Sequence, residues 1–305
     1  MKILLLSRIF PASIESLREK HDVIEAFDAS PEELLDLVVD RETLVFRSGV
    51  DVTAELMSRA ANLGLLIRAG SGLDNLDLDY VNENGLELIR VPGPGARAVA
   101  ELAFSFMLAL SRQVLPADRM LREGHWAKHE LSGFLLEGKT LGIYGAGNIG
   151  SLVGRMGAAW GMNVLGCVEA PSDERANTFR EQGISLVSAG EVVANADFLS
   201  INVPLKESTR GLIGPETLQA MKQGSFLVNL ARGGIVDENS LLEVLNSGRV
   251  LGAALDVHAN EGEGKISVLA DLPNVILTPH IGAMTVDSQR GVGERVIEIV
   301  EQHSR

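Results

Sequence analysis

A glycine-rich loop at residues 145–150 gives the sharpest chemical signal in the sequence. It reads Gly-Ala-Gly-Asn-Ile-Gly, directly after an apolar run at 140–144 and directly before a helical pattern. Gly145 can make the tight turn, Gly147 can let the backbone approach a pyrophosphate, and Gly150 can let helix and strand pack closely. The free amide groups at the start of the following helix suit phosphate groups. The loop therefore predicts a dinucleotide site, and a P-loop is excluded because no Gly-Lys-Ser/Thr follows it.

An acidic residue after the next strand bears on which dinucleotide binds. Glu169 follows Gly150 at close to the spacing at which an acid binds the ribose hydroxyls. No lysine or arginine follows it closely, the next being Arg175, so a 2′-phosphate would meet an acid. NAD is therefore expected in preference to NADP, with NADP still possible. One departure from the usual pattern is that Val168, rather than an acid, occupies the strand end.

Two further polar residues follow later strand patterns. Arg232 comes after the run 225–229, and His280 comes after Thr278-Pro279. Open α/β sheets bind ligands at the carboxyl ends of their strands, which favours a site here. Taken alone, the histidine could equally satisfy a loop carbonyl and the arginine could form a surface ion pair.

These motifs resemble those of the D-isomer-specific 2-hydroxyacid dehydrogenases, most closely the phosphoglycerate dehydrogenase branch, over nearly the whole chain. The glycine loop is joined by Ala-Gly-Ser-Gly-Leu-Asp-Asn at 69–75, Ala-Val-Ala-Glu at 98–101, Val-Pro-Leu at 203–205, Asn-Leu-Ala-Arg-Gly-Gly at 229–234, Ala-Leu-Asp-Val at 254–257 and Thr-Pro-His-Ile-Gly-Ala at 278–283. The resemblance implies an NAD-dependent oxidoreductase that transfers a hydride between nicotinamide and C2 of a small D-2-hydroxy acid.

The same resemblance implies three catalytic residues. His280 is the expected acid and base, and an imidazole suits proton transfer near neutral pH. Glu261 would hydrogen-bond the imidazole and orient it, and Arg232 would hold the substrate carboxylate with its planar fork. The family usually has proline after this glutamate. Because this chain has Gly262 and then Glu263, Glu263 stays open as an alternative partner of His280.

The resemblance also implies the residues that hold the ligands. The expected cofactor contacts are Gly145, Gly147, Asn148, Ile149, Gly150, Glu169, Val203, Pro204, Ala231, Asp256, His280 and Gly282. The expected substrate contacts are Arg47, Arg68, Ser71, Gly72, Arg232 and His280. Arg47 and Arg68 end strands of the first half, where that branch carries basic residues for a substrate phosphate, so D-3-phosphoglycerate is the expected substrate. Gly95 stands where many relatives have asparagine or serine, so one substrate hydrogen bond is expected to be missing.

The remaining histidines, His21, His125, His129, His258 and His303, have no metal-ligand spacing and are expected to be surface or packing residues. No metal site is predicted.

Alternating β and α patterns must position these residues. Strands are expected at 3–6, 23–26, 43–47, 64–69 and 86–91, and then at 140–144, 163–168, 198–202, 225–229, 252–257 and 275–277. Such alternation predicts parallel sheets covered on both faces. The predicted fold is α/β with two doubly wound parallel-sheet domains and a cleft between them. A Rossmann domain, 96–286, is inserted in a flavodoxin-like substrate domain, 1–95 plus 287–305. A long helix, 97–123, should bend or break at Pro116.

Composition narrows the class of protein further. The chain has 305 residues, 46% of them hydrophobic and 22% charged, as in ordinary globular proteins. A formal charge of −14 argues against nucleic acid and anionic membranes as partners. The single cysteine, Cys167, excludes an internal disulfide. The apolar start is too short for a signal peptide, and no run is long enough to span a membrane, so a cytoplasmic protein is expected.

Two other functions stay open at this point. A glyoxylate or hydroxypyruvate reductase would use the same catalytic residues with a different substrate pocket. A dinucleotide-sensing corepressor would share the fold, but the catalytic set and the net charge disfavour it. A homodimer through the 97–123 region is expected, and no C-terminal regulatory domain is expected after residue 305.

Overall fold

The computed structural model describes residues 1–304 and divides the chain into two compact units. Unit 1 combines Met1–Ala98 with the segment that begins at Ala283, and unit 2 is Val99–Gly282. The chain therefore leaves the first unit, builds the second and returns.

Unit 1 is built on a five-stranded parallel sheet. Its strands are β1 (Lys2–Leu5), β2 (Asp22–Glu25), β3 (Thr43–Phe46), β4 (Leu65–Arg68) and β5 (Glu87–Arg90). Their order is β2-β1-β3-β4-β5, which is the doubly wound order of flavodoxin. The helices are α1 (Pro11–Arg18), α2 (Pro31–Leu37), α3 (Ala54–Arg59), α4 (Leu78–Glu83) and α12 (Val286–His303). The flavodoxin-like fold predicted for this unit is confirmed.

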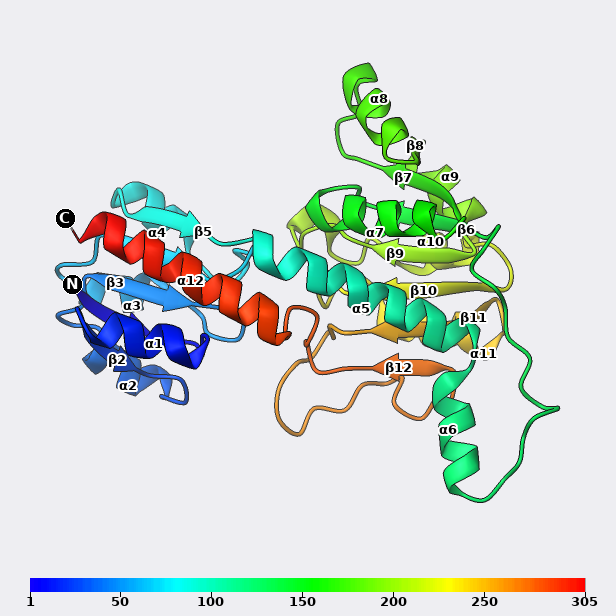
Figure 1. The fold of residues 1–305 in the computed structure, drawn as a ribbon, viewed down its shortest axis with the longest axis horizontal. Helices are drawn as coiled ribbons and strands as arrows, with labels where there is room; N and C mark the ends of the chain where they lie inside the picture. Colours follow the sequence, from blue (N-terminus) through cyan, green and yellow to red (C-terminus); the bar gives the residue numbers. More distant parts are fainter. Residues whose placement is uncertain (305) are drawn as a thin grey trace. The chain divides into compact units, whose positions relative to one another are not determined.

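The alternation of side chains along β1 explains why helices cover both faces of this sheet. Ile3 and Leu5 pack in a core with residues of α1 and α12. Leu4, on the opposite face, packs with residues of α2, α3 and α4. Successive side chains of a strand point to opposite faces, so a strand that is apolar throughout needs cover on both sides. Figure 1 shows α1 and α12 together on one side of this sheet.

Unit 2 is built on a seven-stranded parallel sheet. Its strands are β6 (Thr140–Tyr144), β7 (Asn163–Cys167), β8 (Ile184–Leu186), β9 (Phe198–Ile201), β10 (Ser225–Asn229), β11 (Val250–Leu255) and β12 (Val275–Leu277). The order β12-β11-β10-β9-β6-β7-β8 reverses between β6 and β9, as in a Rossmann fold. The Rossmann fold is thus confirmed. The sequence did not predict β8, because three residues are too few to show a period.

Helices cover both faces of the second sheet. They are α5 (Gly93–Ser111), α6 (Val114–Arg122), α7 (Asn148–Ala159), α8 (Asp173–Glu181), α9 (Ala189–Asn195), α10 (Pro215–Ala220) and α11 (Glu238–Asn246), with a 3₁₀ turn, η1 (Glu207–Thr209). Side chains of α9, α10 and α11 share one core with the sheet. On the other face, α7 packs so closely that a side chain at Gly157 would clash with Leu141 of β6. Figure 1 shows α5 and α7 on this same side.

The long helix expected at 97–123 is two helices, α5 and α6. The break lies at Arg112 and Gln113, and Gln113 is left-handed with φ 51°. Pro116 causes a break upstream of itself, because a proline ring clashes with the carbonyl of the residue four positions earlier, here Arg112. Among the helices of residues 1–304, none alone is long and apolar enough to cross a membrane. The pair α5 and α6, bent by 61°, passes that test together on length and composition only.

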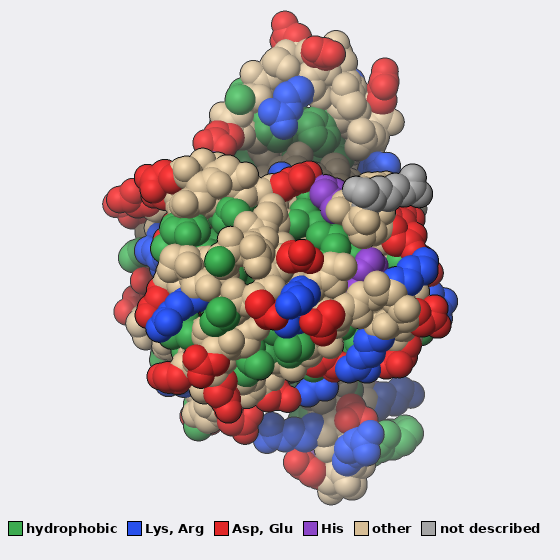
Figure 2. All heavy atoms as spheres, turned by 90° about the vertical axis from the view of Figure 1, so that its left-hand side faces the viewer, with side chains coloured by type: hydrophobic (Ala, Val, Ile, Leu, Met, Phe, Trp, Pro, Cys, Tyr) green, Lys and Arg blue, Asp and Glu red, His purple; other side chains and the backbone are tan. Residues whose placement is uncertain are grey.

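The surface carries charges of both signs. Figure 2 shows acidic and basic side chains interspersed over the face that lies at the left of Figure 1. Exposed ion pairs in unit 1 include Lys2 with Asp40 at 2.7 Å and Lys20 with Glu301 at 2.6 Å. Solvent screens such exposed pairs, so the fold depends on its cores rather than on these contacts.

Candidate active site

The residues singled out in unit 2 gather at one edge of its sheet. All neighbouring strands in this sheet are parallel, so their carboxyl ends meet at the same edge. The glycine loop follows β6, Glu169 follows β7, and Val203 and Pro204 follow β9. The Arg232, Glu261 and His280 loops follow β10, β11 and β12. The reversal of strand order between β6 and β9 makes this edge the expected ligand position in an open α/β sheet.

At two positions of the loop, packing within the protein leaves room only for glycine. Gly145 has φ 96°, and a side chain there would come within 2.7 Å of Val203. A side chain at Gly150 would come within 2.3 Å of the Gly145 carbonyl oxygen. These two positions close the turn and bring α7 against the sheet, as the sequence predicted for them.

Gly147 is different, because no packing contact among residues 1–304 requires it to be glycine. A Cβ atom at Gly147 would meet no atom within 4 Å, and the residue is exposed. It is also the N-cap of α7 and provides no side-chain cap for the first amide groups of the helix. The loop therefore presents an open surface beside the start of a helix that has no side-chain cap, which fits the pyrophosphate of a dinucleotide. Asn148 and Ile149 begin the helix at this point, and Val203 and Pro204 lie at the neighbouring strand end.

The acid after β7 has a neighbour that the sequence did not predict. Glu169 is 87% exposed, and its Oε2 lies 3.5 Å from Nζ of Lys206. Lys206 follows β9, far along the chain, so adjacency in sequence could not reveal it. Arg175 instead donates to the Ala170 carbonyl. The negative charge expected at the ribose position is thus partly offset by an ammonium group.

The Arg232 loop is shaped by a buried asparagine. Asn229, at the end of β10 and 1% exposed, accepts a hydrogen bond from the Ala231 amide at 3.1 Å. Its Nδ2 donates to the Arg232 carbonyl at 3.2 Å. Nη1 of Arg232 donates to the Ala231 carbonyl at 2.7 Å, and the arginine is half-buried. These hydrogen bonds close a short turn, which fixes the backbone position from which the Arg232 side chain extends.

The His280 loop is held by Asp256. This carboxylate accepts bonds from the Thr278 hydroxyl at 2.6 Å and from the amides of Ile281 and Gly282 at 2.8 and 2.7 Å. The Asp256 carbonyl accepts from the His280 amide at 2.8 Å. Asp256 is 1% exposed, so it offers a cofactor almost no surface. The sequence expected it as a cofactor contact, whereas its bonds here are to the loop.

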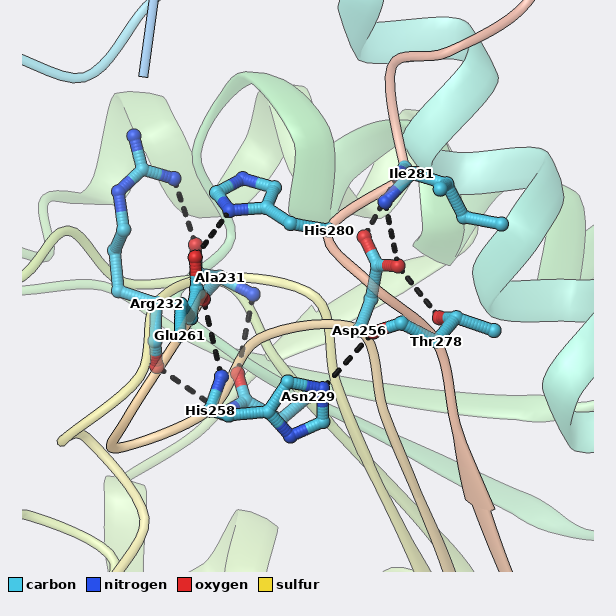
Figure 3. Close-up of polar contacts among 10 residues, drawn as sticks. Asn229, Ala231, Arg232, Asp256, His258, Glu261, Thr278, His280 and Ile281 are labelled. Atoms are coloured by element: carbon cyan, nitrogen blue, oxygen red, sulfur yellow. Dashed lines mark hydrogen bonds and ion pairs between the residues drawn. The ribbon is translucent and has the colours of Figure 1, made fainter. Parts of the chain in front are cut away.

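The imidazole of His280 is paired with Glu261 (Figure 3). Nδ1 of His280 lies 3.0 Å from Oε2 of Glu261, and the His258 amide donates to the other carboxylate oxygen at 3.1 Å. His280 adopts φ 54°, a left-handed conformation that is uncommon for residues other than glycine. Figure 3 shows the His280 ring and the Arg232 guanidinium on the same side of these loops. Of the two glutamates considered, Glu261 contacts the histidine.

The electrostatics of Glu261 favour its ionised form. Burial opposes ionisation, but the hydrogen bonds from His280 and from the His258 amide, together with the electrostatic attraction of the neighbouring His280, outweigh it. The pKa of the Glu261 carboxyl is therefore below its ordinary value. A carboxylate at this position can orient the imidazole and favour its protonated form.

The expected substrate residues of unit 1 lie at the carboxyl end of its sheet. Arg47, after β3, is half-buried, and burial lowers the pKa of its guanidinium. Within residues 1–304, no protein group hydrogen-bonds or pairs with that guanidinium. Arg68 is only 3% exposed, and its Nε donates to the Gly72 carbonyl at 2.7 Å. Arg68 thus shapes the loop that carries Ser71 and Gly72, a contact that the sequence did not predict.

Several residues of the site escaped sequence reasoning. Asn229 and Thr278 lay within recognised motifs, but their side-chain bonds could not be foreseen. No motif in the sequence indicated that Lys206 lies beside Glu169. His258 was expected at the surface or in packing, yet its ring nitrogen Nε2 lies 2.9 Å from the Thr278 carbonyl.

Comparison with known proteins agrees with this geometry. The family profile described as "D-isomer specific 2-hydroxyacid dehydrogenase, NAD binding domain" matches residues 104–282. A D-3-phosphoglycerate dehydrogenase of Methanocaldococcus jannaschii is 38% identical over 303 residues, 99% of this chain and 57% of that protein. A hydroxypyruvate reductase of Thermotoga maritima is 40% identical over 274 residues, 89% of this chain and 86% of that protein. The chain thus spans little more than half the length of the archaeal relative.

A solved structure shares the fold throughout. The D-lactate dehydrogenase of Aquifex aeolicus, in complex with NAD and lactic acid, has a TM-score of 0.87 and 26% sequence identity, and the match covers 100% of this chain and 95% of that chain. The family profile lies within unit 2, and the relatives and the solved structure cover both units. The chain belongs to the D-isomer specific 2-hydroxyacid dehydrogenase family, whose NAD-binding domain it contains.

Proposed function

We propose that this chain is an NAD-dependent dehydrogenase of small D-2-hydroxy acids. The observation that carries the proposal is the pair formed by His280 Nδ1 and Glu261 Oε2 at 3.0 Å, at the same sheet edge as the Gly147 loop and Arg232. This chemistry needs at least an acid–base group, a group that binds the substrate carboxylate and a site for the dinucleotide.

Each residue has a distinct task in the proposed reaction. Bound NAD supplies the nicotinamide that accepts or returns the hydride of C2. Arg232 binds the substrate carboxylate through its planar fork and polarises the carbonyl oxygen. His280 takes the proton from the C2 hydroxyl in oxidation and returns it to the carbonyl oxygen in reduction. Glu261 keeps the imidazole oriented and favours its protonated form.

We further propose NAD as the preferred dinucleotide. The Glu169 carboxylate would accept hydrogen bonds from the ribose hydroxyls and repel a 2′-phosphate. Lys206, 3.5 Å from Glu169, offsets part of that repulsion. The expected preference is therefore modest, and NADPH remains usable.

D-3-phosphoglycerate and its oxidised partner are the substrates we propose. Arg47 supports this choice, because a half-buried guanidinium without a protein partner among residues 1–304 suits an anionic ligand. Arg68 supports it indirectly by holding the Ser71–Gly72 loop. The relatives differ on this point, since one is named for phosphoglycerate and another for hydroxypyruvate.

A substrate panel tests both levels of the proposal. 3-Phosphohydroxypyruvate, hydroxypyruvate and glyoxylate are reduced with NADH, and the phosphorylated acid is expected to have a kcat/KM at least about tenfold higher. Arg47→Ala should abolish that preference and spare activity on hydroxypyruvate. Arg59→Ala is the charge-matched control, because Arg59 ends α3 and precedes the amino end of β4.

The outcomes test the proposed dehydrogenase activity separately from the proposed phosphoglycerate substrate. A native preference for hydroxypyruvate or glyoxylate would replace the phosphoglycerate proposal with a plain reductase. His280→Ala should lower kcat by about 10²–10⁴ on whichever acid is best. If no 2-oxo acid is reduced with either cofactor, the dehydrogenase proposal fails.

We also propose a homodimer formed through the 97–123 region. Within α6 no residue is buried, and Val114, Leu115 and Leu121 are 48–59% exposed. Apolar side chains left uncovered on one helix favour burial against a second copy. Isolation of the protein as a monomer at micromolar concentration, by analytical ultracentrifugation, would contradict this.

A further inference from the structure

His258 lies outside the proposed catalytic set but contacts the three loops that carry it. It follows β11 by three residues and lies between Asp256 and Glu261 in the chain. Its backbone amide faces Glu261 in the same loop, and its ring faces Thr278 in the loop after β12 (Figure 3). Its carbonyl faces Gly233 in the loop after β10.

The first contact fixes the carboxylate that partners the acid–base histidine. The His258 amide donates to Oε1 of Glu261 at 3.1 Å, which leaves Oε2 for His280 at 3.0 Å. Because each carboxylate oxygen has a partner of its own, rotation of the Glu261 carboxylate is restricted. This contact comes from the backbone and survives any change of the His258 side chain.

The second contact is made by the ring. Nε2 of His258 lies 2.9 Å from the Thr278 carbonyl oxygen. A carbonyl only accepts hydrogen bonds, so Nε2 must carry the proton. Nδ1 is buried and has no hydrogen-bond partner within the described residues, so nothing there competes for the proton. The ring is therefore held as the Nε2–H tautomer.

The Thr278 carbonyl, which the ring binds, lies two residues before the left-handed His280. Thr278 is followed by Pro279, which has no amide hydrogen, and then by His280 with φ 54°. A left-handed histidine after proline needs support from its surroundings, because non-glycine residues rarely adopt that conformation. Asp256 accepts hydrogen bonds from the Thr278 hydroxyl and from the amides of Ile281 and Gly282. His258 binds the Thr278 carbonyl.

The third contact faces the arginine loop. A Cβ atom at Gly233 would lie 1.7 Å from the His258 carbonyl oxygen. Gly233 follows Arg232 directly, so the backbone of the arginine loop rests against the backbone of His258. A shift of His258 would therefore be transmitted to the Arg232 turn as well.

We infer that His258 is a positioning residue, which sets the distance between His280 and Glu261 through its Nε2–H bond to the Thr278 carbonyl. This inference rests on the proposed dehydrogenase function for its effect on rate. A misplacement of about 1 Å at a reacting group can cost about 10²-fold in rate. Loss of the bond should lower kcat more than it raises KM, because the ring binds the Thr278 carbonyl and its other nitrogen is buried.

Two substitutions separate the hydrogen bond from the volume of the ring. His258→Phe keeps a flat ring but removes the donor, and His258→Gln keeps a donor at about the reach of Nε2. We expect His258→Phe to lower kcat at least about tenfold with KM and the Kd of NADH changed less than about twofold. His258→Gln should recover most of the lost kcat. His129→Phe, at an exposed histidine of the same unit, should change none of these constants.

A readout independent of activity completes the test. In protein labelled with ¹⁵N-histidine, the His258 ring should show the Nε2–H tautomer, and His258→Phe should shift the ring resonances of His280. His258→Gln and His129→Phe should leave them in place. Full activity of His258→Phe, no rescue by His258→Gln, or unshifted His280 resonances would each overturn the inference. If the native protein reduces no 2-oxo acid but the resonances shift as expected, the proposed function fails and the positioning contact stands.

Discussion

Nδ1 of His280 lies 3.0 Å from Oε2 of Glu261, although nineteen residues separate the two in the chain. Gly262 follows Glu261 with φ 126°, a conformation suited to glycine and closed to the proline usual in the family. With this turn after it, the Glu261 carboxylate faces His280. Among the described residues, Glu263 makes no hydrogen bond to His280. The departure in sequence thus leaves the carboxylate–imidazole pair intact.

Removing the Glu261 charge should slow the reaction. We expect Glu261→Gln to lower kcat at least about tenfold, while Glu263→Gln changes it less than about twofold. Since the pKa of the Glu261 carboxyl is lowered from 4.5, the carboxylate persists above that value, and its contribution is lost only as the pH falls through the lowered pKa. Steady-state rates from about pH 5 to about pH 8, a range in which the Glu261 carboxylate stays ionised, should show the loss of kcat at every pH. A larger effect of Glu263→Gln would assign the role to the other glutamate.

Gly147 should matter for the cofactor and not for folding. A Cβ atom there meets no protein atom within 4 Å, so Gly147→Ala should leave the thermal midpoint nearly unchanged. It should raise the Kd of NADH by about tenfold or more, because the methyl group would occupy the space for the pyrophosphate. NADH fluorescence titration measures this.

Two other glycines serve as controls for that substitution. Gly190→Ala, in α9 and equally open, should change neither Kd nor stability by much. Gly150→Ala should destabilise the protein, because its Cβ would lie 2.3 Å from the Gly145 carbonyl oxygen. Unchanged NADH binding by Gly147→Ala would remove the loop from the cofactor site.

Arg232 should be irreplaceable by lysine. Arg232→Lys keeps the positive charge but loses the planar fork, so kcat/KM should fall at least about tenfold for every 2-oxo acid tested. The Kd of NADH should stay within about twofold. Arg249→Lys, at an arginine before β11 and at the opposite edge of the sheet, is the matched control. An unaffected Arg232→Lys enzyme would place the substrate carboxylate elsewhere.

The Glu169–Lys206 pair should tune the choice of dinucleotide in opposite directions. Removing the carboxylate by Glu169→Ala should weaken the preference for NADH over NADPH, and Lys206→Ala should strengthen it. Because both groups are largely exposed, each change is expected to be about two- to fivefold in the ratio of Kd values. Shifts in the same direction for both variants would contradict an electrostatic origin.

His303 should make the stability of unit 1 depend on pH. Its Nδ1 faces the Ile299 carbonyl at 2.7 Å and its Nε2 faces Glu87 of β5 at 3.1 Å. The Ile299 carbonyl, followed by the Glu87 carboxylate, raises the pKa of this imidazole above its ordinary 6.5. A raised pKa means that the contribution is complete below 6.5 and is lost as the pH rises through the folded value.

The check is a comparison of thermal midpoints. Native protein should exceed His303→Gln at about pH 5.5, and the difference should shrink by about pH 8.5. His129→Gln, at an exposed histidine, should show no such trend. A difference that grows with pH would contradict the assigned charge state.

Local features of this protein could be predicted from its sequence. The glycine loop, the capped start of α2 at Ser30 and the alternation of strands and helices depend on residues a few positions apart. Helix caps, turns and side-chain periods are short-range properties, so they appear directly in the sequence. The break between α5 and α6 also followed from Pro116, although the chain bends at Gln113 because the proline ring acts four residues upstream.

Only the tertiary structure decided which side chains meet. The pairing of His280 with Glu261, of Glu169 with Lys206 and of His258 with Thr278 joins loops that follow different strands. Such contacts depend on strand order and on where each loop turns, which sequence spacing does not encode. Burial was likewise decided by the tertiary structure, since the side chains of Asp256 and Arg68 are enclosed and bind their own or neighbouring loops. The sequence alone determined the chemical groups and their sheet edge, and the packing of the parallel strands determined which of those groups face one another.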